Sequence, residues 1–395
     1  MCPRIRTLIF LPFMTSTTNM YDSDMFEDRN RYVSHQDIGR CFFRMKHLTK
    51  LRTCIATLGS TSLPSNPSSS IERLDVAVHL GNGTGSDQLP NALFSSLKHF
   101  GTFNYYDGIT SILPSFVTQL TSLQLHLNYY QNDIQEVLSK VAEYNPRLLD
   151  LSIHPFRYQY NQSHTRHCWP LLEATMLEPL SRLTRLERFC LSDMIIVSPG
   201  QDAAEALSYV GALPPSLKKL ETPHHVVPLS QLSKVVSRLP RLEYLSVTIT
   251  KLGAATECSG ASQTPNSALQ VIESEFERSI LRAIRTTKLN GTGVDKDVST
   301  YLSAMCTNVQ IVDRPGRYLD YSPEESAVVG KIIISINERL SALVPHGSTL
   351  PRKRTARSSS QVPWQSLPKD IYGSLYVAIY QTLTQVSNDT LRGST

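Results

Sequence analysis

The chain lacks the features of membrane and secreted proteins. No apolar run reaches the roughly 18 residues that a membrane span needs. The apolar stretch at 8–13 is short, broken by Pro12 and not followed by a clear small-residue cleavage site, so no signal peptide is expected. The 7 cysteines lie far apart without a Cys-x-x-Cys pair, which fits neither a disulfide framework nor a zinc knuckle. We therefore expect a cytoplasmic or nuclear protein without membrane contact.

Strong charge bias and catalytic motifs are missing as well. Charged residues make up 18% of the chain and the net charge is +5, with the basic residues scattered except for one late cluster, so we expect no nucleic-acid partner. The patterns Gly-x-Ser-x-Gly, His-Glu-x-x-His and the P-loop are absent. We expect a protein that is not an enzyme and uses no cofactor. Its 41% hydrophobic content is nevertheless enough for a packed core.

What the chain does contain is a repeat. Ser-Arg-Leu-Thr-Arg-Leu-Glu at 181–187 returns as Ser-Arg-Leu-Pro-Arg-Leu-Glu at 237–243, and the weaker copy Pro-Ser-Leu-Lys-Lys-Leu-Glu at 215–221 lies between them. The period is therefore about 28 residues, which suits one strand and one helix.

Each copy contains a short apolar template: one apolar residue, a second three places later and usually a third two places beyond. The template recurs at Ile5/Leu8/Phe10, Leu51/Cys54/Ala56, Ile71/Leu74/Val76, Leu97/Phe100, Leu120/Leu123/Leu125, Leu148/Leu151/Ile153, Leu186/Phe189/Leu191, Leu217/Leu220, Leu242/Leu245/Val247 and Val309/Val312. On a strand this spacing turns the apolar side chains inward and the residues between them toward solvent. A single unit cannot bury its apolar face, so the units must stack.

Between the strands the periodicity changes to that of a helix. In 133–141 the apolar residues Ile134, Val137, Leu138 and Val141 line one face, and similar patterns occupy 170–182, 202–210 and 229–238. Residues 253–267 are expected to form a loop, 268–288 a helix that interrupts the array, and 323–343 a helix that covers the last repeat.

These patterns predict an α/β solenoid, a horseshoe with a parallel concave sheet, convex helices and a helical C-terminal cap. We divide the chain into an irregular repeat solenoid at 1–316, a capping helix within 317–345, a basic Ser/Pro-rich linker at 346–362 and an amphipathic tail helix at 363–395. Leu151, Leu186, Leu220 and Leu245 are predicted to be buried.

The repeats resemble leucine-rich repeats of the irregular, ribonuclease-inhibitor-like kind, especially those of fungal F-box proteins. The likeness rests on phrases such as Leu183–Phe189 and Asn145–Ile153 and covers about residues 1–316. It implies a non-enzymatic protein-protein interaction scaffold and, more finely, the substrate-recognition part of an F-box-type ubiquitin-ligase adaptor with a Skp-type adaptor as partner. The asparagine that regular repeats place after the strand is mostly missing, and no F-box precedes the first strand.

The tail offers two interpretations. Leu367-Pro368-x-x-Ile371 is similar to the start of an F-box helix, whereas the surrounding pattern also suits an amphipathic helix that docks on the chain or on a partner. A repeat scaffold unrelated to ubiquitin is the alternative to the adaptor role. The basic cluster Arg352, Lys353, Arg354 and Arg357 is either a nuclear-import signal or a solvated linker.

An enzyme alternative rests on Gly81-Asn82-Gly83-Thr84-Gly85, which follows the apolar strand at 74–78. A Rossmann-like cofactor-binding enzyme places its glycine loop there, and Asp107 lies about 20 residues further on, as such a site requires. The residues after Gly85 delay any helix, so a phosphate could not sit directly on a helix N-terminus.

Two groups of histidines invite a test for metal. His126 and His154 follow Leu123 and Leu151 by the same three residues, so they should lie on neighbouring strands about 5 Å apart. Zinc needs a third ligand, which only the polar loop with His164, His167 and Cys168 could supply. We expect ordinary surface histidines here and at His224-His225, and no metal site.

The solvent-facing residues of the strands form the candidate partner-binding site on the concave face: Asp75, Gln124, His126, Asp150, His154, Arg188, Lys219, Glu221, Tyr244 and Ser246. Their mixed charges, amide and single tyrosine suit a protein partner held by polar contacts around a few anchors. Arg188 and Tyr244 are the predicted anchors, because arginine and tyrosine are enriched at binding hot spots. The alternative is that all ten are merely solvated strand residues.

Overall fold

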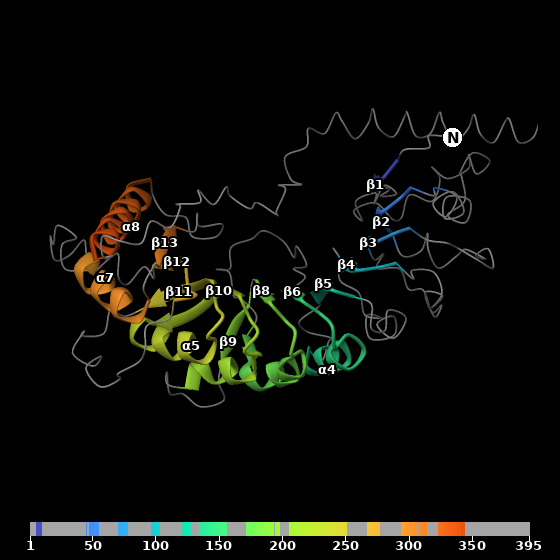
Figure 1. The fold of residues 1–395 in the computed structure, drawn as a ribbon, viewed down its shortest axis with the longest axis horizontal. Coiled ribbons are helices and arrows are strands. Elements are labelled where there is room, and N and C mark those ends of the chain that lie inside the picture. The colour runs from blue at the N-terminus through green and yellow to red at the C-terminus, as the bar shows by residue number, and fades with distance from the viewer. Residues whose placement is uncertain are drawn as a thin grey trace, which may run out of the picture. The chain divides into compact units, whose positions relative to one another are not determined.

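The structure, a computed structural model, describes residues 5–9, 45, 47–54, 70–77, 96–102, 120–127, 134–155, 171–192, 194–197, 205–250, 267–276, 294–306, 309–313 and 323–343. Within these ranges eleven strands form one sheet (Figure 1). They are β1 (Thr7–Ile9), β2 (Lys50–Cys54), β3 (Arg73–Ala77), β4 (His99–Thr102), β5 (Ser122–Leu127), β6 (Asp150–Pro155), β8 (Arg188–Leu191), β10 (Lys219–Pro228), β11 (Tyr244–Thr250), β12 (Val271–Phe276) and β13 (Gln310–Asp313).

The strands lie in chain order and every neighbouring pair is parallel. Their register aligns one apolar residue from each strand: Leu8, Leu51, Leu74, Phe100, Leu123, Leu151, Phe189, Leu220, Leu245, Ile272 and Ile311. Leu8 is partly buried, and each of the others is at most 2% exposed. A period-2 strand turns alternate residues to the same face, so this alignment makes one continuous core. The predicted burial of Leu151, Leu186, Leu220 and Leu245 is confirmed, since all four are 0% exposed.

A backbone pattern at the start of each strand fixes this register. The carbonyl of Thr49 accepts from the N–H groups of both Glu72 and Arg73 in the next repeat, at 2.9 and 3.0 Å. The same two-donor arrangement recurs at the carbonyls of Glu72, Lys98, Thr121, Leu149, Glu187, Lys218 and Glu243. Each repeat is therefore tied to the next at an equivalent point.

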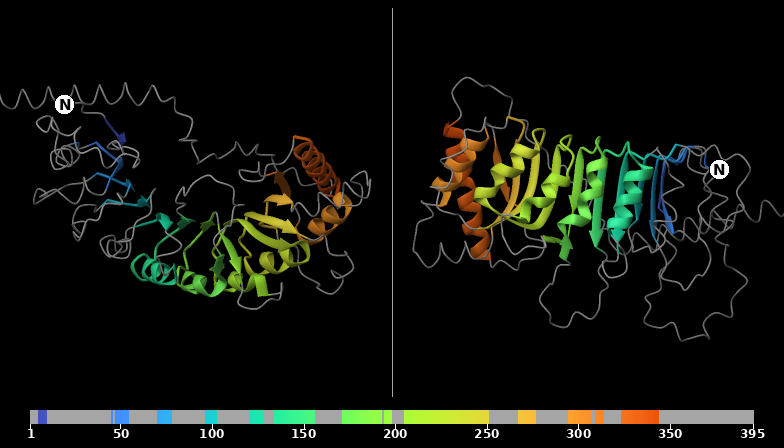
Figure 2. Two further views of the ribbon diagram at one scale, coloured as in Figure 1. Left: turned by 180° about the vertical axis from the view of Figure 1, so that it is seen from behind. Right: turned by 90° about the horizontal axis from the view of Figure 1, so that it is seen from below.

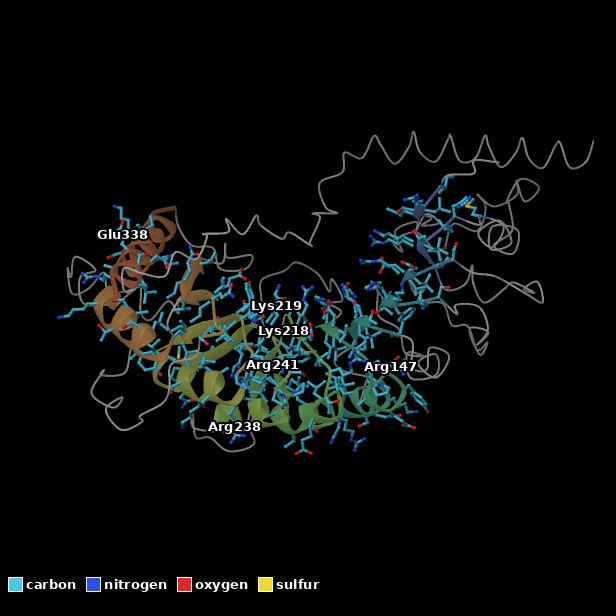
Figure 3. All side chains as sticks on the ribbon, in the orientation of Figure 1. Arg147, Lys218, Lys219, Arg238, Arg241 and Glu338 are labelled. Atoms are coloured by element: carbon cyan, nitrogen blue, oxygen red, sulfur yellow. The ribbon has the colours of Figure 1, made fainter. Side chains whose placement is uncertain are left out.

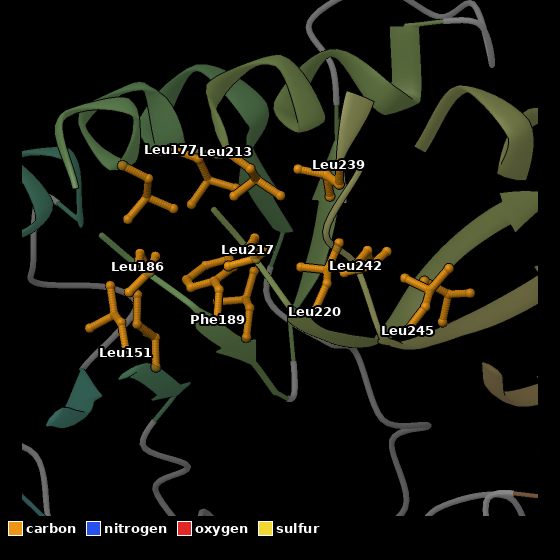
Figure 4. Packing of buried hydrophobic residues seen from close by; sticks show 14 of the residues in the cluster. Leu151, Leu177, Leu186, Phe189, Leu213, Leu217, Leu220, Leu239, Leu242 and Leu245 are labelled. Carbon is orange, nitrogen blue, oxygen red and sulfur yellow. The ribbon is translucent and has the colours of Figure 1, made fainter. Parts of the chain in front are cut away.

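Helices cover the core on one side of the sheet (Figure 2). They are α4 (Ile134–Tyr144), the 3-10 helices η5 (Ala174–Arg182), η6 (Glu205–Ala212) and η7 (Leu229–Gln231), and α5 (Leu232–Arg238). In α4 the predicted face is buried, and Leu177 of η5 packs toward Leu186 and Phe189 (Figure 4). Pro179 lies inside η5, where proline cannot donate the hydrogen bond that an α-helix needs. The helices expected at 170–182 and 202–210 are present in the described residues as the 3-10 helices η5 and η6, and Pro179 accounts for this in η5 alone.

A second, two-stranded sheet was not predicted. β7 (Leu171–Glu173) pairs in parallel with β9 (Ile195–Val197). Leu172 and Ile196 of this pair are buried in the core, whereas Leu171 is 51% exposed. The described part of the segment expected to be helical thus begins as the strand β7 at Leu171, and its helix starts at Ala174.

The described solenoid closes with two helices, α7 (Val294–Met305) and α8 (Pro323–Leu343). α8 buries Ile332, Ile333, Ile336 and Leu340, and it packs on α7 and β13. Its Asn337 side chain accepts from the Ile311 N–H at 2.9 Å and donates to the Ile311 carbonyl at 2.7 Å. One carboxamide therefore bonds both backbone groups of the middle of the last strand, in the way that a further strand would. No helix in the described residues is both long and apolar enough to span a membrane.

One predicted helix in the C-terminal half was wrong. The helix expected over 268–288 is instead the strand β12 at Val271–Phe276, and the residues after Phe276 up to 288 lie outside the described part. Leu269 and Ile272 occupy template positions, because Ile272 is aligned with Leu245. Short apolar runs do not distinguish strand from helix, and the longer apolar spacing after 276 favoured the helix.

The template was also placed out of phase at two strands. At β2 the buried positions are Leu48, Leu51 and Thr53, so Leu51 is the second residue of the template and not the first. At β13 Ile311 is buried, whereas the predicted Val312 is 39% exposed. A shift of one residue moves a side chain to the other face of a strand.

Candidate functional site

The solvent-facing positions of the sheet form two rows on the side opposite the helices, here called the open face. The first outer row is Thr7, Lys50, Arg73, His99, Ser122, Asp150, Arg188, Lys219, Tyr244, Val271 and Gln310, and the second is Ile9, Arg52, Asp75, Gly101, Gln124, Ser152, Cys190, Glu221, Ser246, Glu273 and Val312. Figure 3 shows Lys219 on this side and Arg238 on the helical side. Eight of the ten predicted site residues belong to these rows.

Five of the predicted residues interact at the centre of the open face. Arg188 of β8 lies 3.5 Å from the Asp150 carboxylate of β6, its direct neighbour in the first outer row. On β10, Lys219 forms an ion pair with Glu221 and places its ammonium 4.5 Å from the centroid of the Tyr244 ring on β11. One contact joins β6 to β8 and the other joins β10 to β11, and the register aligns Asp150, Arg188, Lys219 and Tyr244 on these four successive strands.

The electrostatics of this centre are dominated by partial burial. Burial raises the pKa of the Asp150 carboxyl above its usual 3.8, and the positive charge of Arg188 opposes that shift. The carboxylate therefore takes up a proton more readily than an exposed aspartate as the pH falls. Its ion pair with Arg188 weakens in the same range.

The two predicted histidines lie together beyond the second row. The rings of His126 and His154 are stacked with centroids 4.9 Å apart and an interplanar angle of 18°, which confirms the expected spacing of neighbouring strands. Nδ1 of His126 is hydrogen-bonded to the carbonyl of Thr102, and Nδ1 of His154 to the hydroxyl of Ser192. These bonds fix both rings across β4 to β8, so each imidazole already has a protein partner.

No metal centre is formed by the described part of the chain. Within the ranges given above, no group of three or more His, Cys, Asp or Glu side chains is placed to hold an ion. The third ligands considered from the sequence, His164, His167 and Cys168, lie outside the described residues.

Two predictions of exposure were wrong. Ser246 is only 1% exposed although it occupies the second outer row. It is aligned between Glu221 and Glu273, and its short side chain lies below the level of these longer neighbours. His225 is also 1% exposed, because the register of β10 shifts between Glu221 and Val226 and turns this residue inward.

The buried His225 contacts a residue that the sequence did not single out. Its ring meets that of Tyr209 in η6 edge-on, with centroids 4.9 Å apart. Burial raises the pKa of the Tyr209 hydroxyl to about 12, so the phenol stays protonated. This pair belongs to the core beneath β10 and not to the open face.

Sequence reasoning also missed the basic residues of the open face. Lys50, Arg73 and His99 precede the aligned residues Leu51, Leu74 and Phe100 by one position, as Asp150 precedes Leu151. Arg52 of the second outer row follows Leu51. The signal was present, but the out-of-phase template at β2 hid Lys50 and Arg52.

The enzyme alternative gains no support from the described strands. The strand before the glycine loop is β3, which lies between β2 and β4 in unbroken chain order. Doubly wound sheets bind dinucleotides where the strand order reverses, and no such reversal occurs at β3. The loop itself, Gly81–Gly85, and Asp107 lie outside the described residues.

A parallel sheet in chain order, with helices between successive strands on one side, defines a leucine-rich-repeat-type solenoid, which confirms the predicted fold class.

Comparisons with known proteins return distant likenesses. No protein-family model matches the chain, and no curated protein matches it. The leucine-rich repeat-containing protein LegL7 from Legionella pneumophila is 12% identical over 76% of this chain and 94% of that chain, with a TM-score of 0.36. The match to the complex of Rad7 and Elc1 in yeast is 12% identical, covers 76% of this chain and 71% of that chain, and has a TM-score of 0.37. The match to an internalin (inlF) from Listeria monocytogenes is 15% identical, covers 61% of this chain and 66% of that chain, and has a TM-score of 0.31. Likeness at this level carries no argument about what the present chain binds.

Proposed function

We propose that this protein is a non-enzymatic scaffold that binds a protein partner on the open face of its sheet. The observation that carries the proposal is a pair of contact groups in neighbouring positions of the first outer row: Asp150 with Arg188, and Lys219 with Glu221 and Tyr244. These side chains lie on four adjacent strands, on the side that α4, η5, η6 and α5 leave uncovered.

The chemistry of these two groups favours a protein over a small ligand. They offer two cations, two carboxylates and one aromatic ring on a regular sheet surface, a mixture that suits polar contacts spread over a wide area. Arg188 keeps 46% of its side chain exposed while its ion pair with Asp150 orients the guanidinium. A pre-oriented arginine loses little conformational freedom on binding, and arginine and tyrosine are both enriched at hot spots.

The test is partner capture by proximity labelling with the full chain, followed by the double variant Arg188→Ala with Tyr244→Ala. We expect at least one captured partner to bind the double variant at least tenfold more weakly. The matched control is Arg182→Ala with Arg185→Ala, two exposed residues at the turn between η5 and β8. Undiminished binding of every partner by the first variant would move the interface away from the open face.

In its finer form the proposal makes this chain the substrate-recognition part of a fungal F-box-type ubiquitin-ligase adaptor. Its support is the resemblance of the repeat phrases Asn145–Ile153 and Leu183–Phe189 to those proteins. A Skp-type adaptor should then bind the full chain, and Leu367→Asp with Ile371→Asp should abolish that binding if the tail supplies the contact. Failure of the full chain to bind would leave a repeat scaffold unrelated to ubiquitin.

We also propose a cytoplasmic or nuclear location, on the cysteine usage and the basic cluster at 352–357. Imaging of the tagged full chain, with and without Arg352→Ala, Lys353→Ala and Arg354→Ala, distinguishes the two compartments. Nuclear signal that the triple variant loses would assign the cluster to import, and signal outside both compartments would refute the proposal.

A further inference from the structure

The N-terminal end of the open face carries a row of basic side chains. Lys50, Arg73 and His99 are direct neighbours on β2, β3 and β4 in the first outer row. Lys50 and His99 are exposed, and Arg73 keeps 48% of its side chain exposed. Adjacent strands are 4.7–4.9 Å apart, so the row is about 10 Å long. Arg52 adds a further cation on β2 in the second outer row.

The charge balance of this end differs from that of the rest of the face. The outer rows of β2 to β4 hold Lys50, Arg52 and Arg73 against the single carboxylate Asp75. From β5 to β12 the outer rows instead hold Arg188 and Lys219 against three carboxylates, Asp150, Glu221 and Glu273. Like charges placed directly opposite one another destabilise a sheet, so the basic row is not explained by stability.

The one carboxylate in the outer rows of β2 to β4 leans away from Lys50. Asp75 pairs with Arg73 on its own strand at 3.0 Å. Its Oδ1 also lies over Gly101 of β4, where a Cβ would come within 2.6 Å of it. Across the sheet Lys50 faces Thr7 and Arg73, and among the described residues no carboxylate lies within ion-pair distance of its ammonium.

His99 is the titratable member of this row. Partial burial of its ring lowers its pKa, the charges of Arg73 and Lys98 lower it further, and Asp150 and Glu72 oppose the shift. A carboxylate bound at this row would restore the charged form of His99. Binding should therefore strengthen as the pH falls below 6.5, the usual pKa of an imidazole.

We propose that the basic row of β2 to β4 binds a short carboxylate-rich segment of a protein partner. The inference rests on the proposed function and assigns chemistry to one end of the same face. A polynucleotide is a poorer occupant, because tight binding of a phosphate backbone needs many cationic contacts. The face offers few beyond this row, and the carboxylates Asp150, Glu221 and Glu273 would repel a strand that continued along it.

The experiment measures binding of a fluorescently labelled hexaglutamate peptide to the full chain by anisotropy. Lys50→Glu with Arg73→Glu should weaken binding about tenfold or more, since two favourable exposed pairs become repulsive. The matched control is Arg182→Glu with Arg185→Glu, which changes the net charge equally at exposed sites away from the open face. The control should stay within about twofold of the unchanged chain, and circular dichroism should show that both variants are folded.

Three outcomes would overturn this inference: no peptide binding at physiological salt, equal loss in both variants, or tighter binding of a labelled single-stranded DNA hexamer than of the peptide. The proposed function is judged separately by the response of captured partners to the Arg188 and Tyr244 changes. Loss of partner binding there, together with indifference to hexaglutamate, would refute the acidic segment and keep the scaffold.

Discussion

Replacement of Leu220 by alanine is the sharpest test of the stacked core. Leu220 is 0% exposed and lies in the aligned apolar row between Phe189 and Leu245 (Figure 4). Phe189 and Leu245 are held in place by the backbone hydrogen bonds between β8, β10 and β11, so the site cannot collapse easily around the missing atoms. We therefore expect a loss near the middle of the usual range for buried leucine, about 3–4 kcal/mol in the free energy of unfolding.

The measurement is urea unfolding followed by far-ultraviolet circular dichroism. The matched control is Val226→Ala on the same strand, where the side chain is 39% exposed and should cost less than about 1 kcal/mol. A loss below about 1 kcal/mol for Leu220→Ala, or equal losses for the two variants, would refute the stacked core. If the unfolding free energy of Leu220→Ala alone depends less steeply on urea concentration, the repeats on the two sides of β10 unfold separately in that variant.

Three further predictions concern titration, reactivity and the end of the array. Burial raises the pKa of Asp150 in the folded state, so the stability that its protonated form provides is lost as the pH rises through that pKa. The unfolding free energy of the unchanged protein minus that of Asp150→Asn should therefore fall as the pH rises above about 4, and a rise would show that Arg188 outweighs burial. Burial raises the pKa of the Cys306 thiol to about 12. Iodoacetamide at about pH 8 should therefore modify Cys306 much more slowly than the half-buried Cys190 in the folded protein. Peptide mass spectrometry measures both rates, and equal rates would contradict this prediction. Asn337→Ala should lower the free energy of unfolding by about 1–3 kcal/mol in thermal or urea unfolding, because it leaves the Ile311 N–H and carbonyl without their side-chain hydrogen bonds. Ser341→Ala on the exposed side of α8 is the control and should cost less than about 0.5 kcal/mol. Equal losses for the two variants would contradict a special role for Asn337.

The sequence was sufficient for the fold class and for most strands of the described sheet. Where the template was complete, as in Leu148/Leu151/Ile153, it located both the strand and its buried face. It failed where an apolar position held a different residue type, as with Thr53 at β2, which is buried without being apolar. At β12 the template was incomplete, because Leu269 and Ile272 are followed by Ser274 in place of an apolar residue, and a competing helical spacing outweighed it.

The candidate site was predictable as positions but not as contacts. The residues flanking each buried leucine are visible in the sequence, which is why Asp150, Arg188 and Tyr244 were named. The contacts between these side chains depend on the register between repeats of unequal length. That register is set by the backbone hydrogen bonds at the start of the strands. The inward turn of His225 depends on a bulge in β10 that has no sequence signal of its own.

The amide of Asn337 has a consequence for assembly. A parallel sheet built by stacking has no intrinsic length, because each new strand leaves an edge that can accept another strand, from the same chain or from a second molecule. Here the Asn337 side chain occupies the N–H and carbonyl of Ile311 and α8 packs against β13, so a second chain cannot pair with this part of the last described strand. The residues that limit strand addition therefore lie in α8 and not in the repeats. Repeats inserted before β13 would lengthen the sheet and leave this edge covered.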